Sequence, residues 1–445
     1  MSIDFKLRDF FYPREILGLR RTLERTQWLS PEKLREYQEM RLRKIVDHAY
    51  QRVPYYKALF DNLGLSPTDI RRVEDLKLLP LLTKDSVRDE SSALLAEKSD
   101  QYQPKLYSTS GTSGEPLLFY LDKSANTLEF VYYWRYWGWA GYRLGDRFAE
   151  LGSHFFLERP KLSGDAYHYQ TYLRRLHLNS AQVSSSGVSD MASAIRKYRP
   201  LFLKGVSSAL YFFALNLQEA GISDLKFKAV FSTGEVVTEL YRKTVESVLN
   251  APLLDSYGHM ERTVSISQCL QGGYHVNSDY GILELTNETS GDNGTFLTGR
   301  AVGTSLYNLA MPLIRYDIGD EIETFSEPKS CPCGRTLPLI KAIHGRSEDV
   351  IVTPDGRFIT SLFIVPEFVR GIRFAQFAQV SESEMEVRVV PSLEWNHEAE
   401  EQLLLYTRRL LGPSFRLTLN QTTRNGLQMD RSGKIRSVIG LATNA

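Results

Sequence analysis

The part of the sequence richest in phosphate-binding groups is the segment from Tyr107 to Pro116. It holds six hydroxyl-bearing residues and two glycines within ten positions. Glycine lets the backbone turn sharply and approach a ligand, and the N–H groups that such a turn exposes attract anions. The segment therefore predicts a cradle for a polyphosphate, although no Gly-Lys-Ser/Thr follows it, so it is not a Walker A loop. The alternative that this segment alone leaves open is a polar surface turn.

Cysteine and histidine supply a second candidate site. The chain has only three cysteines, Cys269, Cys331 and Cys333, and His275 follows the first of them after five intervening residues. So few cysteines, and an odd number, argue against a disulfide framework. Three thiolates and one imidazole would complete a closed tetrahedral zinc site with a structural role. The alternative is three reduced thiols with no common function.

Five further segments extend the pattern that begins at Tyr107. They are residues 232–235 (STGE), 255–261 (DSYGHME), 316–320 (YDIGD), 345–350 (GRSEDV) and 430–435 (DRSGKI). Together the six segments resemble, in order and spacing, the motifs of the adenylate-forming superfamily of acyl-CoA synthetases, nonribosomal adenylation domains and luciferases. Each segment alone is a weak signal, but six in order are specific. The resemblance implies that the chain uses ATP to activate a carboxylic acid.

The same resemblance implies which residues bind the nucleotide. They are, in chain order, Ser110, Gly111, Thr112, Ser113, Gly114, Gly234, Glu235, Tyr257, Gly258, Asp320 and Arg346. Residues 110–114 would hold the β- and γ-phosphates, and 234–235 would lie along the adenine. Residues 257–258 would line the α-phosphate and adenine region. Asp320 would accept hydrogen bonds from the ribose hydroxyls, and Arg346 would support the ribose or a phosphate.

Three residues would carry catalysis if the resemblance holds. Lys434 would reach in from the C-terminal domain and bridge the substrate carboxylate and the developing charge. Glu261 would help to bind Mg²⁺, which neutralises phosphate charge and favours oxygen ligands. Thr112 would add its hydroxyl to the phosphate cradle. Taken singly, Glu261 could be an exposed helix charge and Lys434 one of many solvated lysines.

Within the superfamily the chain resembles the phenylacetate–CoA ligase branch and its CapK-like members. The segments that carry this likeness are residues 48–56 (HAYQRVPYY), 79–84 (LPLLTK) and 331–336 (CPCGRT), together with the short C-terminal domain. Some members of that branch look similar at the cysteines and bind zinc. Leu117 and Leu118 stand where other branches have a lysine, as in the phenylacetate branch. Glu348 stands where the superfamily has its usual Asp or Lys hinge, and a longer carboxylate should still serve there.

The acid to be activated is indicated only in outline. Aromatic residues crowd the segment 130–139, and Phe130, Trp134 and Trp137 would share one face of a helix. That face could line an acyl pocket, although core packing is the simpler interpretation. The segment that begins at Lys204 resembles the family segment near the acyl pocket. The branch favours an aryl or arylacetic acid with coenzyme A as co-substrate. Alternatives are transfer to an amine, a hydroxyl or a carrier-protein thiol, or a noncatalytic nucleotide-binding homologue.

The alternation of strand and helix patterns predicts an α/β fold, and the resemblance implies that this fold is of the adenylate-forming type. We expect an N-terminal AMP-binding domain at 1–344, with a largely helical lead-in at 1–105 and a small β subdomain at about 276–344. A small α+β domain is expected at 345–445, and the resemblance implies that it is a mobile lid. Short apolar runs near 148, 201 and 229 alternate with helical patterns at 190–198, 209–220 and 238–249, which is typical of layered α/β sheets. Asp355-Gly356 predicts a hairpin at the start of the lid.

Composition adds limits on partners and location. The formal net charge is +1, and basic residues are spread along the chain, so nothing points to a nucleic-acid partner. The chain begins without the features of a signal peptide and has no run of about 18 apolar residues, so a cytoplasmic protein without a membrane span is expected. The oligomeric state stays open, with a homodimer among the alternatives.

Overall fold

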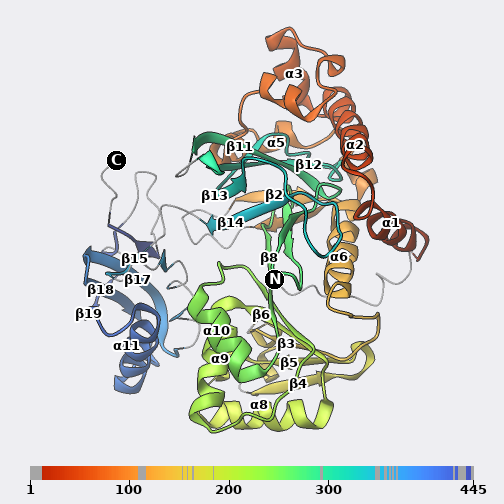
Figure 1. The fold of residues 1–445 in the computed structure, drawn as a ribbon. Coiled ribbons are helices and arrows are strands. Elements are labelled where there is room, and N and C mark those ends of the chain that lie inside the picture. The colour runs from red at the N-terminus through yellow and green to blue at the C-terminus, as the bar shows by residue number, and fades with distance from the viewer. Residues whose placement is uncertain are drawn as a thin grey trace.

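The computed structural model describes residues 13–441 apart from several gaps. The gaps are 109–116, 153, 158, 163–164, 184, 291–293, 346–350, 355–357, 360–361, 363–364, 367–368, 424–425 and 429–436. Figure 1 shows a large mixed α/β part and a smaller α+β part formed by the last quarter of the chain. This confirms the predicted fold class. Among the described helices, none has both the length and the apolar composition needed to cross a bilayer.

Helices open the described chain, as expected. They are α1 (Pro13–Thr26), α2 (Pro31–Arg52), α3 (Pro54–Leu63), α4 (Lys84–Asp89) and α5 (Ser91–Leu94). Ser30 caps α2 by accepting a hydrogen bond from the Lys33 N–H, and Pro31 suits the first turn because its missing N–H is not needed there. Pro54 then ends α2 and begins α3. The helices bury their apolar faces in one core with the strands that follow.

One twelve-stranded sheet, in the order β11-β12-β13-β14-β10-β9-β8-β7-β6-β3-β5-β4, runs through the large part. Its parallel half comprises β3 (Phe148–Leu151), β5 (Arg175–Leu178), β6 (Phe202–Val206), β7 (Ala229–Thr233) and β8 (Leu253–Gly258), with β4 (Tyr167–Gln170) antiparallel at the edge.

Helices α8 (Ser185–Tyr198), α9 (Ser207–Glu219) and α10 (Glu239–Leu249) cover one face of this half of the sheet. Helix α6 (Lys123–Gly138) covers the other; α7 (His154–Leu157) is a single turn after β3. The right-handed crossovers expected of such strands bring their carboxyl ends to one edge.

The antiparallel half continues the same sheet. It comprises β9 (Ser265–Gln268), β10 (Tyr274–Val276), β11 (Gly281–Ser290), β12 (Phe296–Ser305), β13 (Tyr316–Phe325) and β14 (Leu339–Gly345). Strand β13 begins at Tyr316, and just before it the Leu313 carbonyl accepts a hydrogen bond from the Ser305 N–H at the end of β12. A separate hairpin of β1 (Lys105–Ser108) and β2 (Leu118–Leu121) flanks the glycine-rich segment.

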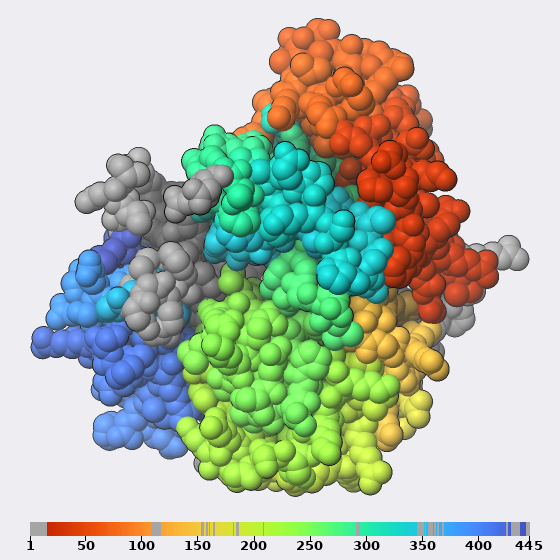
Figure 2. All heavy atoms as spheres, viewed as in Figure 1, coloured from red at the N-terminus to blue at the C-terminus, as the bar shows by residue number. Residues whose placement is uncertain are grey.

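The C-terminal part holds a four-stranded sheet in the order β19-β18-β17-β20. The elements of the whole C-terminal part are β15 (Ile351–Val352), β16 (Phe358–Ile359), β17 (Ile372–Ser381), β18 (Glu384–Pro391), α11 (His397–Leu411), β19 (Arg416–Gln421) and β20 (Val438–Ile439). Strands β15 and β16 pair antiparallel, while the predicted turn at Asp355-Gly356 lies outside the described residues. Tyr406 of α11 packs on Phe212 of α9 and donates a hydrogen bond to the Val183 carbonyl. This part therefore rests beside α9 (Figures 1 and 2).

Candidate functional site

Two of the predicted nucleotide segments span the carboxyl ends of neighbouring parallel strands. Thr233 of β7 pairs with Ser256 of β8, and residues 234–235 and 257–258 follow directly. Gly234 has a φ of 87°, in the left-handed region that favours glycine. The two segments are side by side because the carboxyl ends of parallel strands share one edge, the usual place for a ligand in such sheets.

Two hydrogen bonds join these strand ends to β13, far along the chain. The Tyr257 hydroxyl donates to Oδ2 of Asp320 at 2.7 Å. The Tyr316 hydroxyl donates to Oε1 of Glu261 at 2.6 Å, and Glu261 is buried. Two carboxylates from separate segments therefore line one edge of the sheet. They can accept hydrogen bonds from hydroxyls or bind a hard cation.

Lys84 is a neighbour of this edge that the sequence alone did not single out. The main chain of Leu82 pairs with the start of β13, through Leu82 N–H to Arg315 O at 2.9 Å and Asp317 N–H to Leu82 O at 3.0 Å. A Cβ built on Gly319 would lie 3.5 Å from Lys84 Nζ. The signal was present in the sequence, because Lys84 ends the segment 79–84 that resembles the phenylacetate branch, but nothing there connected it to Asp320.

Several predicted site residues lie outside the described residues. They are Ser110, Gly111, Thr112, Ser113, Gly114, Arg346, Glu348 and Lys434. The strands on either side of the glycine-rich segment are described and pair from Lys105 opposite Leu121 to Ser108 opposite Leu118. The roles given to these eight residues stay predictions.

Below the strand ends lies a buried polar cluster centred on Asp255. Its Oδ1 accepts from the Ser232 hydroxyl at 3.3 Å and its Oδ2 from the Tyr274 hydroxyl at 3.1 Å. Burial raises the pKa of Asp255 to about 6, because the charged form is poorly solvated there. Burial also lowers the pKa of His259, four residues further along the chain, whose Nε2 lies 2.8 Å from the Thr263 hydroxyl. At neutral pH His259 is therefore uncharged.

The four predicted metal ligands lie together. One ligand atom from each of Cys269, His275, Cys331 and Cys333 falls within 4.8 Å of every other. The Sγ atoms of Cys269 and Cys331 are 3.5 Å apart, and Cys333 Sγ is 3.3 Å from His275 Nε2. Neighbouring ligand atoms of a tetrahedral zinc site with Zn–S near 2.3 Å are about 3.7 Å apart, so the cluster has the size of such a site.

The surroundings of the cluster suit a metal as well. His275 Nδ1 lies 3.1 Å from the Leu337 carbonyl, so Nδ1 carries the proton and Nε2 is left for a metal. Burial raises the pKa of the Cys331 thiol to about 12. Burial acts in the same direction on Cys333, but the backbone N–H and side chain of Arg335 lower the pKa of that thiol below its usual value. A bound cation would favour all three thiolates.

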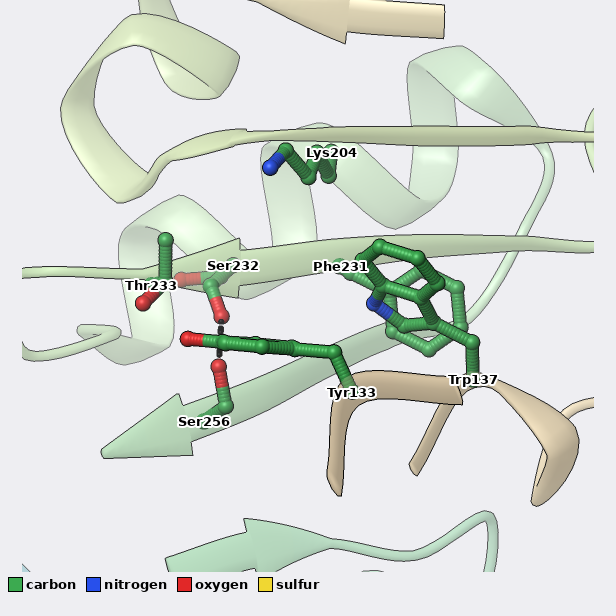
Figure 3. Close-up of a pocket in the computed structure, with 7 residues that line it drawn as sticks. All are labelled: Tyr133, Trp137, Lys204, Phe231, Ser232, Thr233 and Ser256. Atoms are coloured by element: carbon green, nitrogen blue, oxygen red, sulfur yellow. Dashed lines mark hydrogen bonds between the residues drawn. The ribbon is translucent and has the colours of Figure 1, made fainter. Parts of the chain in front are cut away.

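A narrow hollow opens beside the strand ends and reaches into the sheet. Its lining residues are Tyr133, Trp137, Lys204, Phe231, Ser232, Thr233 and Ser256 (Figure 3). The hollow has room for about one water molecule. Core packing was the simpler interpretation of the aromatic segment 130–139, and an acyl pocket was the alternative. Tyr133 and Trp137 border the hollow, whereas Phe130 and Trp134 do not, and Trp137 is also part of a buried aromatic core.

Comparison with known proteins supports the resemblance seen in the sequence. The chain is 29% identical over 335 residues to the phenylacetate–coenzyme A ligase of Thermus thermophilus, which covers 73% of each protein. It is 27% identical over 344 residues to the Pseudomonas putida enzyme of the same name, covering 75% of each. It is 22% identical over 337 residues to the protein CapK of Staphylococcus aureus, covering 74% of this chain and 71% of CapK. No protein-family profile matches the chain.

A solved structure shares the fold. The 2-hydroxyisobutyryl-CoA ligase in the postadenylation state, in complex with R3-HIB-AMP, aligns with a TM-score of 0.60 at 18% identity. The alignment covers 94% of this chain and 91% of that one. The adenylate-forming fold predicted from the sequence motifs is thereby confirmed.

Proposed function

We propose that this chain, a homologue of phenylacetate–coenzyme A ligases and CapK with the adenylate-forming ligase fold, activates a carboxylic acid with ATP and transfers the acyl group to coenzyme A. The observation that most supports the proposal is the convergence of the two acidic motifs, through Tyr257 with Asp320 and Tyr316 with Glu261, at the edge where the parallel strands end. The ribose hydroxyls of a nucleotide need hydrogen-bond acceptors, and its phosphates need a cation site, of this kind.

The reaction has two steps. In the first, a carboxylate oxygen attacks the α-phosphorus of ATP, the bond from that phosphorus to the bridging oxygen breaks, and pyrophosphate leaves. In the second, the thiol of coenzyme A loses its proton and attacks the acyl carbon, and AMP leaves with the bonding pair. Two anions must approach each other in the first step, so catalysis depends on fixed donors and positive charge around the phosphates.

The described residues suit the nucleotide part of this reaction. Asp320, held by Tyr257, would accept hydrogen bonds from the ribose hydroxyls. Glu261 is held at one oxygen by Tyr316, which leaves its other oxygen for a cation. Bound Mg²⁺ would neutralise phosphate charge there. Lys84, beside Gly319, would add positive charge near the same edge.

The remaining assignments come from the resemblance. Residues 110–114 would hold the β- and γ-phosphates, Arg346 would support the ribose or a phosphate, and Lys434 would bridge the carboxylate and the α-phosphate. Cytoplasmic location and the domain boundary near 345 stay predictions.

We also propose that the cluster of Cys269, His275, Cys331 and Cys333 binds a structural zinc ion. A zinc with four protein ligands has no open position for substrate, so it would stabilise rather than catalyse. Cys269 follows β9, while Cys331 and Cys333 lie between β13 and β14. The ion would therefore tie together two stretches of the antiparallel half of the sheet.

Product analysis tests the acceptor. With an aryl or arylacetic acid and ATP, AMP release is expected to rise with coenzyme A, and an acyl-CoA thioester should be recovered. AMP release that ignores coenzyme A but follows an added amine would favour the alternative of an adenylate-forming amide ligase. A chain that binds ATP but releases neither AMP nor pyrophosphate with any acid would be a noncatalytic nucleotide-binding homologue.

A further inference from the structure

Arg262, the residue after Glu261, has a strained backbone conformation. Its N–H donates a hydrogen bond of 3.1 Å to the His259 carbonyl, which closes a tight turn around Glu261. Its φ of 56° lies in the left-handed region, which residues other than glycine, asparagine and aspartate rarely enter. Such a conformation persists only where the surrounding contacts enforce it, so contacts of the arginine side chain must compensate for the strain.

The first two turns of α6 hold the guanidinium group. Arg262 Nη1 donates to Asn126 Oδ1 at 2.6 Å and to the Ala125 carbonyl at 3.3 Å. Its Nε lies 3.9 Å from Glu129 Oε2, and both side chains are only 10% exposed. That carboxylate is fixed in turn by the Tyr280 hydroxyl, which donates to Oε2 at 2.5 Å. Arg262 therefore connects its own turn to α6 through hydrogen bonds and opposite charge.

Asn126 shares its side-chain oxygen with the strand that leads into the glycine-rich segment. This Oδ1 also accepts a hydrogen bond of 2.7 Å from the hydroxyl of Tyr107 on β1. The guanidinium carbon of Arg262 lies 5.5 Å from the centre of the Tyr107 ring, within the range of a cation–π contact. The Asn126 amide nitrogen donates to the Asp122 carbonyl at 3.0 Å, which orients the oxygen toward both donors. Two separate contacts therefore connect Arg262 with Tyr107.

Stability alone gives little reason for an arginine at this position. Its Nε is buried and finds no hydrogen-bond partner among the described residues. A buried donor left unpaired costs free energy, and a buried ion pair is often no more stabilising than apolar residues of similar size. Glu261, in contrast, gains a fixed geometry, because Tyr316 holds its carboxylate and Arg262 holds the turn that carries it. These contacts fix the side chain proposed to bind Mg²⁺ relative to β1.

We infer that Arg262 is a positioning residue for the nucleotide cation, which keeps the Glu261 carboxylate at a set distance from β1 so that Mg²⁺ can bind Glu261 and the β- and γ-phosphates together. The inference rests on the nucleotide-binding part of the proposed function and adds a residue to it. Mg²⁺ requires near-ideal octahedral geometry with oxygens at about 2.0–2.1 Å, so it tolerates little displacement of a ligand. Loss of the Arg262 contacts should therefore weaken binding that depends on the cation and the outer phosphates, and should spare the binding of AMP.

The test is isothermal titration of the whole chain with MgATP and, separately, with AMP. Arg262→Met keeps a long side chain and removes its donors. It should raise the dissociation constant for MgATP about tenfold or more, the effect expected for hydrogen bonds from a charged group, and change that for AMP less than about twofold. Arg262→Gly removes the side chain and relieves the left-handed backbone, and it should show the same selective loss.

Tyr107→Phe acts from the other end of the contact and is a milder change, because it removes only a hydroxyl. It should weaken MgATP binding about threefold and again spare AMP. Since Arg262 and Tyr107 share Asn126, the double variant Arg262→Met/Tyr107→Phe should lose less affinity than the product of the two single losses. Arg72→Met, at an exposed arginine, is the matched control and should leave both dissociation constants unchanged.

Circular dichroism and thermal unfolding show whether each variant is folded. MgATP binding that is unaffected by Arg262→Met, or restored by Arg262→Gly, overturns the inference. An equal loss of affinity for MgATP and AMP in folded variants also overturns it, because that result indicates a merely structural role. If neither Arg262 variant folds, Tyr107→Phe decides by the same comparison.

Acid activation is a separate outcome. A selective loss of MgATP binding in a chain whose wild type releases no pyrophosphate with any acid would overturn the proposed function and leave the role of Arg262 standing. A wild-type protein that binds no MgATP would overturn both.

Discussion

The hydroxyl of Tyr257, at the end of β8, donates a hydrogen bond of 2.7 Å to Oδ2 of Asp320 on β13. The two residues are 63 positions apart, and the bond fixes the carboxylate that would receive the ribose. A preoriented acceptor binds a hydroxyl at less entropic cost than a mobile one.

Removal of this contact should weaken ATP binding. Tyr257→Phe is expected to raise the KM for ATP about three- to tenfold, the effect of one hydrogen bond of about 1 kcal/mol. Asp320→Asn should lower kcat/KM for ATP about 10- to 100-fold, because it removes a charged acceptor as well. Steady-state kinetics with ATP varied measures both. The control Tyr172→Phe alters an exposed tyrosine and should leave the kinetics with ATP unchanged. Unaltered kinetics in Asp320→Asn would contradict the role of Asp320 at the ribose.

Asp255 predicts an unusual dependence of stability on pH. Its pKa in the folded protein is about 6, against 3.8 for an ordinary aspartate. The folded state therefore favours the protonated form, and stability is lost as pH rises from about 4 to about 6. Asp255→Asn should raise the free energy of unfolding at pH 8 by about 1–3 kcal/mol and flatten the curve in that window.

Urea unfolding at several pH values measures this effect. Asp224→Asn is a matched control on the surface, where Arg196 lowers the pKa of the carboxyl, so it should bring no gain at pH 8. A less stable Asp255→Asn variant at pH 8 would contradict the raised pKa.

The metal cluster predicts about one zinc ion for each chain. His275→Ala should lose the ion and lower the thermal midpoint by about 5 °C or more, since metal binding contributes to folding free energy. Elemental analysis and thermal unfolding, with and without a chelator, provide the measurement. His397→Ala, at an exposed histidine, is the matched control. Purified wild-type protein that holds no zinc and ignores chelators would overturn the proposal.

Residue types and spacing predicted much of the fold. The largely apolar runs at 148–151 and 229–231 became β3 and β7, because a strand covered on both faces is mostly apolar. The helical pattern expected at 238–249 is α10 to within one residue, since Thr238 caps that helix by accepting from the Tyr241 N–H. The likeness to adenylate-forming enzymes rested on motif order, which survives large changes elsewhere in the sequence.

What the sequence could not give depends on contacts between distant segments. The proximity of Lys84 to Gly319 follows from the pairing of Leu82 with β13, and no local pattern encodes that pairing. The same holds for Tyr133, which was passed over in favour of Phe130 and Trp134. All three lie on α6, and only the packing of the helix on the sheet decides which aromatic ring borders the hollow.

Isotope exchange between labelled pyrophosphate and ATP tests acid activation most directly, because it needs the adenylate step and no acyl acceptor. The wild-type protein should incorporate label into ATP only when a carboxylic acid and Mg²⁺ are present, with coenzyme A omitted. Lys434→Ala should still bind ATP but exchange no label. Exchange at the wild-type rate in Lys434→Ala would contradict the role of that lysine, and a wild-type protein silent across a broad panel of acids would contradict the account as a whole.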